Sequence, residues 1–185
     1  MDEKQLINQI LSGDSRASHR FASHYGKRVY KLAFHLTSNR QDAEDITQDV
    51  MIKAVQSLPQ FDGRARLDTW LYRITVNTYL SEQRKPYTNN TTSDEELDAR
   101  ANHELLPDQQ TQNRLVGERI ETALNSLSPT QRMVFVLKHF KHLKIDEIAE
   151  IVQAKPGTIK SHLYRAVEQL RKKLGDLNKI YNREG

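Results

Sequence analysis

An acidic, polar strip divides this chain into two basic blocks, and this division limits what the chain can fold into. Residues 86–113 carry one arginine against six acidic residues, whereas residues 1–85 have a net charge of +3 and residues 114–174 one of +6. The first half of the strip has clusters of Asn, Thr and Ser without sustained helical periodicity, which is typical of a flexible linker. We therefore expect a domain over 1–85, a linker over 86–113, a domain over 114–175 and a tail over 176–185.

The N-terminal block has the periodicity of amphipathic helices. Apolar residues recur at spacings of three or four, and strand-like alternation is absent, which favours an all-α fold. The pattern predicts helices over 3–11, 15–36, 42–58 and about 69–85. Two of these have clear buried stripes: Phe21, Tyr25, Val29, Leu32 and Leu36 in the second, and Ala43, Ile46, Val50, Ala54 and Leu58 in the third.

The C-terminal block predicts four helices that end in a helix-turn-helix. Ser128 to Gln131 form a capping box with proline at the first helical position, and this opens a helix to about His139. The segment IDEIAEIV predicts a short helix, QAKPG a tight turn, and TIKSHLYRAVEQLRKKL a long basic helix. The expected inward residues are Leu115, Ile120, Ala123, Leu124 and Leu127 in a helix over about 114–126, and Ile159, Leu163, Ala166, Val167, Leu170 and Leu174 in the last helix.

Composition excludes several classes of protein. The chain has no cysteine, which excludes a disulfide framework, a Cys-ligated zinc site and thiol catalysis. No apolar run reaches the 18 residues of a membrane span, and the first residues, MDEKQLINQI, are unlike a secretory signal, so we expect a cytoplasmic chain. The net charge of +4 and the pI near 9.2 favour a polyanionic partner.

One candidate surface is acidic. Asp42, Asp45 and Asp49 share a face of the helix predicted over 42–58. Acidic residues in a first turn complement the helix dipole, but Asp49 lies two turns in. Docking on a basic partner and simple solvation both remain open for this stripe.

Two other candidate surfaces suit nucleic acid. In and before the helix over 69–85, aromatic residues interleave with Arg64, Arg66 and Arg73, a pattern that binds single strands by stacking on bases and pairing with phosphates. Core packing of Trp70 and of the tyrosines remains open as an alternative. The start of the last helix has residue types that suit contacts in a major groove, namely Thr158, Lys160, Ser161, Tyr164 and Arg165.

These segments together resemble a known family. DAEDITQDVMIKAVQSLPQFDG, TWLYRITVNTYLSEQRK, LSPTQRMVFVLKHFKHLKIDEIAEIV and GTIKSHLYRAVEQLRKKL stand in the order found in bacterial RNA polymerase sigma factors of the extracytoplasmic-function (ECF) type, of the sigma-70 superfamily. The resemblance covers roughly 15–85 and 114–175. It implies a sigma factor without catalytic residues, cofactor or metal, which binds core RNA polymerase and directs promoter-specific transcription initiation.

The resemblance also implies roles for individual residues. Asp45, Gln48, Asp49 and Ile52 would face the clamp helices of the polymerase β′ subunit. Residues at the −10 element would be Phe61, Arg64, Arg66, Arg73 and Asn77, with Phe61 and Asn77 bounding the pocket for a base flipped from the duplex. Residues at the −35 element would be Thr158, Lys160, Ser161, Tyr164 and Arg165. An anti-sigma factor would be a further partner.

Two departures from the family lie in the turn of the helix-turn-helix. Gln153 stands where a glycine is usual, and Lys155 where a Ser or Thr cap is usual. A non-glycine residue in the left-handed region costs about 1 kcal/mol, and a missing cap costs about as much.

Two other classes of function are alternatives. One is an autonomous helix-turn-helix regulator, which would have no need of the acidic stripe or of the Trp70–Asn77 helix. The other is an enzyme with a metal held by His139 and His142, or by His19 and His24, but no set of carboxylates accompanies these pairs in the sequence. Whether the two domains are compact or extended stays open.

Overall fold

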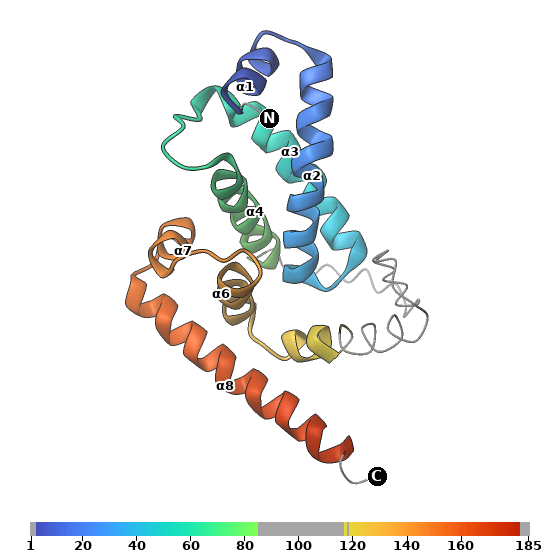
Figure 1. The fold of residues 1–185 in the computed structure, drawn as a ribbon, viewed down its shortest axis with the longest axis vertical. Coiled ribbons are helices and arrows are strands. Elements are labelled where there is room, and N and C mark those ends of the chain that lie inside the picture. Colours follow the sequence, from blue (N-terminus) through green and yellow to red (C-terminus); the bar gives the residue numbers. More distant parts are fainter. Residues whose placement is uncertain (1–2, 85–116, 118, 182–185) are drawn as a thin grey trace.

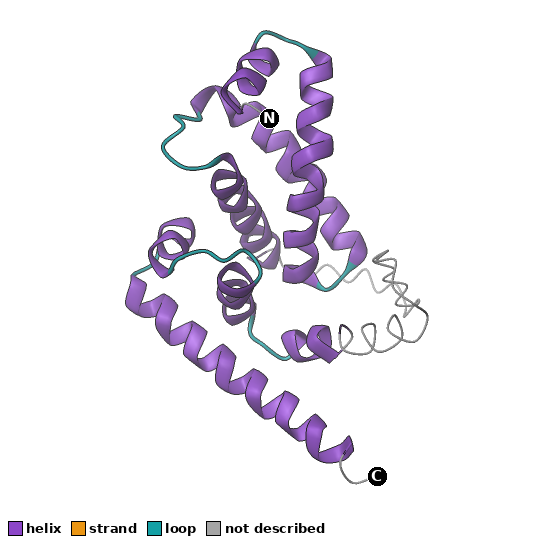
Figure 2. Cartoon of the chain, in the orientation of Figure 1, coloured by secondary structure: helices purple, strands orange, loops and turns teal. Residues whose placement is uncertain are grey.

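The computed structural model describes residues 3–84, 117 and 119–181, with side chains as far as residue 175, and over these ranges it contains helices and loops but no strand (Figure 2). The predicted all-α fold is therefore confirmed. The predicted linker lies outside the described residues. The elements are α1 (Glu3–Leu11), α2 (Ser15–Thr37), α3 (Arg40–Ser57), the 3-10 helix η1 (Leu58–Gln60), α4 (Leu67–Arg84), a helical segment over 119–125, α6 (Pro129–His139), α7 (Ile145–Val152) and α8 (Pro156–Tyr181).

Helix α2 is the centre of the N-terminal domain, with α1, α3 and α4 packed around it (Figure 1). The Asp14 carboxylate caps its start by accepting from the N–H groups of Arg16 and Ala17, at 2.8 and 3.2 Å. Both predicted stripes are confirmed, since each of their ten members is at most 4% exposed.

The turn between α2 and α3 is short because both of its residues act as caps. Ser38 ends α2 in the left-handed conformation (φ 51°), and its N–H donates to the Phe34 carbonyl at 2.8 Å. The next residue, Asn39, accepts from the Asp42 N–H at 3.0 Å and starts α3. The tight link turns α3 back along α2.

Helix α4 buries a face that the sequence pattern does not reveal. The helix starts at Leu67 rather than near 69. Val76 and Tyr79 lie in the core, while Trp70 and Tyr72 are only partly buried. The other buried residues of this face, which the spacing does not predict, are Leu67, Leu71, Thr75 and Thr78.

The four helices predicted for the C-terminal domain are present, the first of them described over 119–125. The capping box is confirmed, because the Ser128 Oγ accepts from the Gln131 N–H at 3.3 Å and Gln131 Oε1 accepts from the Ser128 N–H at 3.1 Å. Two inward assignments were wrong: Ile120 is 38% exposed and Leu174 is 40% exposed. Helix α8 continues to Tyr181, past the boundary at 175 where a tail was predicted.

The two domains are in contact, which answers what the sequence left open. Helix α6 lies between the N-terminal domain and α8 (Figure 1). One of its sides joins a buried cluster that continues into the N-terminal core, including Met133, Leu137 and Val76. A second, smaller cluster contains Leu124, Ala166 and Leu170.

The turn between α7 and α8 holds its left-handed residue without a glycine. Gln153 has φ 54° and ψ 46°, and its N–H donates to the Ala149 and Glu150 carbonyls. The Ala154 N–H donates to the Ala149 carbonyl at 2.9 Å, so the helix end has the pattern of a Schellman motif.

This geometry predicts that Gln153→Gly stabilises the protein by about 0.5–1 kcal/mol, because glycine adopts a positive φ without steric cost. The measurement is the urea midpoint followed by circular dichroism. Gln153→Ala is the control and should give no gain, since alanine keeps the Cβ. A lower midpoint for Gln153→Gly would show that the Gln153 side chain stabilises the turn.

Candidate nucleic-acid interface

The residues predicted to face a protein partner lie along the exposed side of α3. Asp45, Gln48, Asp49 and Ile52 are all exposed, and Ile52 is exposed by 49%. Val55, one turn on and 41% exposed, extends the apolar end. We call Asp42, Asp45, Gln48, Asp49, Ile52 and Val55 the α3 surface.

The carboxylates of the α3 surface are crowded. The pKa of Asp42 is raised, first by partial burial and then by the negative charges of Asp45 and Glu82. Lys53 of α3 approaches this stripe, and its Nζ lies 4.0 Å from Asp49 Oδ2. Exposed apolar side chains beside a cluster of negative charges are typical of a surface that binds a basic protein.

The residues predicted for the −10 element lie on α4 and on the loop before it. The ring of Phe61 packs against the ring of Trp70 at 5.2 Å between centroids. Asn77 is exposed and lies seven residues beyond Trp70, which is about 10 Å along the helix axis on the same side. Arg64 and Arg66 are exposed, and Arg64 pairs with Asp62 at 3.2 Å.

Arg73, the fifth residue predicted for the −10 element, forms an ion pair with the C-terminal domain. Its Nη2 lies 3.0 Å from the Glu150 Oε1 of α7, and its side chain is 38% exposed. One residue earlier, the Tyr72 ring has the Lys141 Nζ above it at 5.4 Å from the centroid. Burial, with the nearby charge of Lys31, lowers the pKa of Lys141 to about 8.

The residues predicted for the −35 element form one exposed surface at the start of α8. Thr158, Lys160, Ser161, Tyr164 and Arg165 are all exposed, and Tyr164 by 69%. The Ser161 Oγ donates to the Gly157 carbonyl at 3.0 Å. Ile159 and Ala166 are buried on the opposite side of the helix, so packing on α6 and α7 sets which side chains of α8 face outward.

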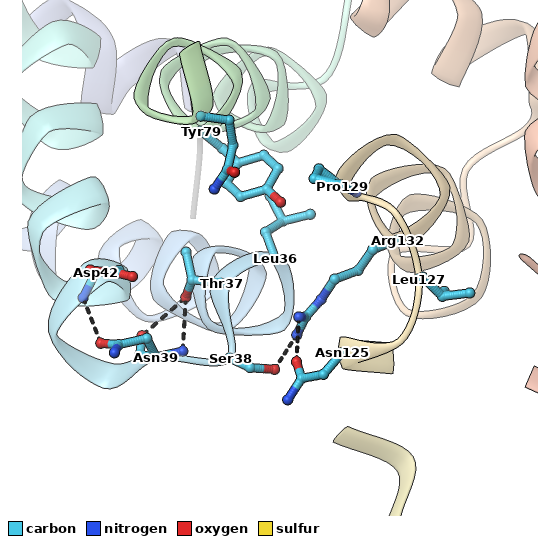
Figure 3. Close-up of a pocket in the computed structure, with 11 residues that line it drawn as sticks. Leu36, Thr37, Ser38, Asn39, Asp42, Tyr79, Asn125, Leu127, Pro129 and Arg132 are labelled. Carbon is cyan, nitrogen blue, oxygen red and sulfur yellow. Dashed lines mark hydrogen bonds between the residues drawn. The ribbon is translucent and has the colours of Figure 1, made fainter. Parts of the chain in front are cut away.

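No pattern in the sequence indicates a buried arginine at the domain junction. The Arg132 side chain is 7% exposed, and its guanidinium donates to the His35 carbonyl at 2.6 Å. It also donates to Asn125 Oδ1 at 2.6 Å and to the Ser38 Oγ (Figure 3). Glu121 Oε2 lies 3.4 Å from Arg132 Nη2. Burial lowers the pKa of Arg132, and the charge of Glu121 opposes that effect.

Arg132 lines one wall of a polar cavity of about 480 Å³ at this junction, together with Ser38, Asn39, Asp42 and Tyr79. In the described part of the chain, every buried side-chain nitrogen or oxygen atom has a hydrogen-bond partner. The junction is therefore a satisfied polar network rather than a site with an unpartnered group.

The histidines weighed as metal ligands lie in other surroundings. The His139 ring packs on the Phe135 ring at 4.5 Å between centroids. Over the described residues no group of three or more His, Cys, Asp or Glu side chains is placed to hold a metal ion. Of the helices that are described, none combines the length and the apolar character needed to cross a membrane.

Comparison with known families assigns both domains. The model of Sigma-70 region 2 matches residues 21–86, and the model of Sigma-70, region 4 matches residues 117–170. The first match contains α3 and α4, and the second contains α6, α7 and the start of α8.

Among solved structures, a sigma factor RpoE in complex with the anti-sigma factor NepR from Bartonella quintana matches with a TM-score of 0.67 and 25% identity, over 85% of this chain and 96% of that chain. CnrH in complex with the cytosolic domain of CnrY has a TM-score of 0.65 at 20% identity, over 94% of this chain and 97% of that chain, which shows the shared fold.

Relatives in sequence extend over nearly the whole chain. RNA polymerase sigma-H factor of Pseudomonas aeruginosa is 27% identical, over 95% of each chain. ECF RNA polymerase sigma factor SigW of Bacillus subtilis is 32% identical, over 94% of this chain and 97% of that relative. With both sigma-70 regions present in order, the chain belongs to the ECF RNA polymerase sigma factors, a family of transcription initiation factors that are not enzymes.

Proposed function

We propose that this sigma factor binds core RNA polymerase through the α3 surface, reads −35 duplex DNA with the start of α8, and traps a base flipped from the −10 element beside α4. The observation that carries the proposal is that one chain presents two unlike exposed surfaces on separate domains: the acidic and apolar α3 surface, and the basic start of α8. A regulator that binds DNA by itself has no need of the first surface.

The α3 surface fits the clamp helices of the β′ subunit. Its carboxylates would pair with basic side chains of the polymerase, and Ile52 and Val55, both exposed, would pack on apolar ones. Charge pairs would set the orientation and the association rate, and the apolar contact would slow dissociation.

The start of α8 fits a major groove because its polar side chains face outward together. Lys160 and Arg165 supply cations for phosphates, while Ser161 and Tyr164 supply hydroxyl groups for phosphates or base edges.

This arrangement predicts that Arg165→Ala weakens binding of the holoenzyme to −35 duplex about tenfold and lowers the slope of log K against log salt by about 1. Fluorescence anisotropy over a salt series measures both quantities. The control is Arg171→Ala, which removes another exposed arginine of α8, one that pairs with Glu168. An unchanged slope for Arg165→Ala would show that this side chain makes no phosphate contact.

Around α4, the Phe61–Trp70 ring pair and the Asn77 amide offer a stacking surface and hydrogen-bonding groups for an extruded base. The unstacking costs a few kcal/mol per base, and polymerase binding together with −35 anchoring would hold the DNA in place while the base is captured.

We therefore expect Asn77→Ala to reduce discrimination among −10 sequences about tenfold, because an amide that pairs with a base edge contributes about 1–3 kcal/mol. Core affinity should be unchanged. Run-off transcription on templates with single −10 substitutions measures discrimination, and Ser81→Ala, one turn further along α4 and also exposed, is the control. Loss of core affinity would instead assign Asn77 to the polymerase contact.

An anti-sigma factor is a further proposed partner. Two of the similar structures are complexes, one with the anti-sigma factor NepR and one with the cytosolic domain of CnrY. A protein that covers either DNA-binding surface or the α3 surface would prevent initiation.

Run-off transcription of a genomic fragment library with sigma-free core polymerase tests the proposed function. New start sites that depend on this protein and share two spaced elements would support it. If the protein binds duplex DNA by itself but yields no new start sites, it acts as an autonomous regulator.

A further inference from the structure

Helix α2 presents a row of basic side chains on its outer side. The row repeats at spacings of four, four, three and four residues and consists of Arg16, Arg20, His24, Lys27 and Lys31, all of them exposed. From the helical turn and rise, these positions fall within about 80° of the helix circumference and extend over about 22 Å. We call these five residues the α2 stripe.

The core packing of α2 keeps the stripe facing outward. The other side of the helix carries its buried residues, among them Phe21, Tyr25 and Leu32. Because one side of the helix is fixed in the core, the helix cannot turn about its axis, and the opposite side stays open to solvent or to a partner. The stripe is therefore a fixed line of positive charge on the central helix of the N-terminal domain.

The carboxylates around the stripe do not neutralise it. Between residues 15 and 37 the sequence contains no Asp or Glu, and over the described residues no ion pair joins the stripe to a carboxylate. Arg20 Nη2 donates to a neutral group, Gln9 Oε1, at 2.7 Å. At the start of α4, Asp68 is already engaged by Arg28 at 2.6 Å. The stripe thus keeps its charge for a partner outside the chain.

The stripe lacks the apolar area that a protein interface or a membrane-surface helix uses. No large hydrophobic side chain of α2 is exposed in the described structure, whereas Ile52 and Val55 are exposed on α3. Protein interfaces have an apolar centre, and helices that lie in a membrane surface insert an apolar face. Phosphate groups of nucleic acid need only cations and polar side chains, and these are what the stripe offers.

The aromatic rings of α2 favour a duplex over a single strand as the partner. Surfaces that bind single strands stack bases on exposed rings. On α2, Phe21 and Tyr25 are buried, while Tyr30 and Phe34 are only partly exposed and stack on each other at 6.2 Å between centroids. A straight row of cations about 22 Å long suits the backbone of a duplex, which carries one negative charge per about 1.7 Å of its axis.

One end of the stripe lies near the side of α4 that the function proposed above assigns to DNA. Burial and then the charge of Lys31 lower the pKa of Lys141, and Lys141 Nζ lies 5.4 Å from the centroid of the Tyr72 ring of α4. Arg28 of α2 and Asp68 of α4 form an ion pair beside them. A duplex along the stripe would therefore continue toward α4.

We propose that the α2 stripe binds the phosphate backbone of duplex DNA, without reading its sequence, as a third DNA-binding surface of this chain. The proposal rests on the function proposed above in one respect, namely that promoter DNA is brought to the N-terminal domain. The contact positions the duplex and does not select the promoter, because phosphate contacts carry no sequence information. Each cation that meets a phosphate releases a counterion, so the contribution of the stripe falls as salt rises.

The double variant Arg16→Gln with Lys27→Gln tests the stripe. Fluorescence anisotropy of the full chain with a short mixed-sequence duplex, over a salt series, should show a slope of log K against log salt that is lower by about 2, and an affinity at about 0.1 M salt that is lower about 50-fold. The control, Arg40→Gln with Lys173→Gln, removes the same charge at exposed positions outside the stripe and should change both quantities much less. Equal slopes for the two variants would overturn the proposal.

Other probes separate duplex DNA from the alternative partners. The loss should be the same for duplexes of different sequence and smaller for a single strand of the same length. A larger loss on the single strand would overturn the assignment to duplex DNA. Unchanged duplex affinity with reduced affinity for core polymerase would assign the stripe to an acidic protein surface, and unchanged duplex affinity with reduced binding to vesicles of anionic lipid would assign it to a membrane. Either result would overturn the proposal.

Cross-linking gives a local readout that a change in overall charge does not affect. Because the chain has no cysteine, a photo-cross-linker attached at Ser23→Cys, exposed and one turn before Lys27, is unique. It should cross-link the full chain to duplex DNA, whereas the same label at Gln48→Cys, exposed on the acidic α3 surface, should not. Equal yields at the two sites would overturn the proposal.

The anisotropy and cross-linking measurements need neither a promoter nor polymerase. A failure to drive transcription would therefore refute the proposed function, while the α2 stripe would be judged on its own result.

Discussion

Reversal of two charges on the α3 surface, Asp45→Lys with Asp49→Lys, is expected to weaken the affinity for core RNA polymerase at least about 100-fold. Both carboxylates are exposed, so the change leaves the core of the domain intact. At a basic partner surface, however, each lysine replaces an attraction by a like-charge contact, and such contacts cost several kcal/mol. The measurement is competition with a labelled sigma factor for core polymerase.

The matched control makes the same net change elsewhere, with Asp146→Lys and Glu168→Lys, both outside the α3 surface. It should retain core affinity. The melting temperature of the α3 double variant should stay within a few degrees of that of the parent. The only ion pair of these two aspartates described above, between Asp49 and Lys53, is exposed and 4.0 Å long, and its loss costs less than about 1 kcal/mol. Full core affinity in the α3 double variant would refute the role of the α3 surface.

Glu121→Gln is expected to lower the free energy of unfolding by about 2 kcal/mol at pH 7, because it leaves the buried Arg132 guanidinium without its compensating charge. Urea denaturation measures this. Glu168→Gln is the control, since the exposed pair of Glu168 with Arg171 is worth less than about 1 kcal/mol. Equal effects of the two changes would show that Arg132 does not depend on Glu121.

The same variant should alter the pH dependence of stability. Burial alone would raise the pKa of Glu121, but hydrogen bonds from His35 and Ser38 and the charges of His35 and Arg132 hold it below its ordinary value of 4.5. A carboxyl group with a lowered native pKa stabilises the fold fully at pH values above 4.5, and this contribution is lost as pH falls through the native pKa. As the pH falls below 4.5, the Glu121→Gln variant should therefore lose less free energy of unfolding than the parent. If the slope of the unfolding free energy against pH is the same for both proteins below pH 4.5, Glu121 does not have a lowered pKa in the native state.

Much of the fold follows from the sequence because it rests on local contacts. Helix positions and buried stripes depend on residues three or four apart, as in the five members of the α2 stripe, and the caps at Ser128 and Gln131 depend on neighbours within three positions. The acidic stripe of α3 and the basic start of α8 were also visible in the sequence, because helical spacing alone groups their residues on a face. Their binding roles stay predictions.

Helix α4 shows where local pattern stops being sufficient. Polar and apolar residues alternate around it, so the spacing of Trp70, Tyr72 and Tyr79 did not identify the face that Leu67 and Leu71 bury. That face is chosen by the helices that pack on it, and Thr75 and Thr78 are tolerated there because each hydroxyl finds a partner, the Leu71 carbonyl for one and the Lys53 Nζ for the other.

The positions of most helices and the solvent-facing surfaces of α3 and α8 follow from local spacing in the sequence. The contact between the domains, the burial of Arg132 and the ion pair between Glu150 and Arg73 are visible only in the folded molecule. These partners are 77 to 97 residues apart along the chain. These contacts form because two packed surfaces match in shape and polarity, and no spacing along the chain predicts them.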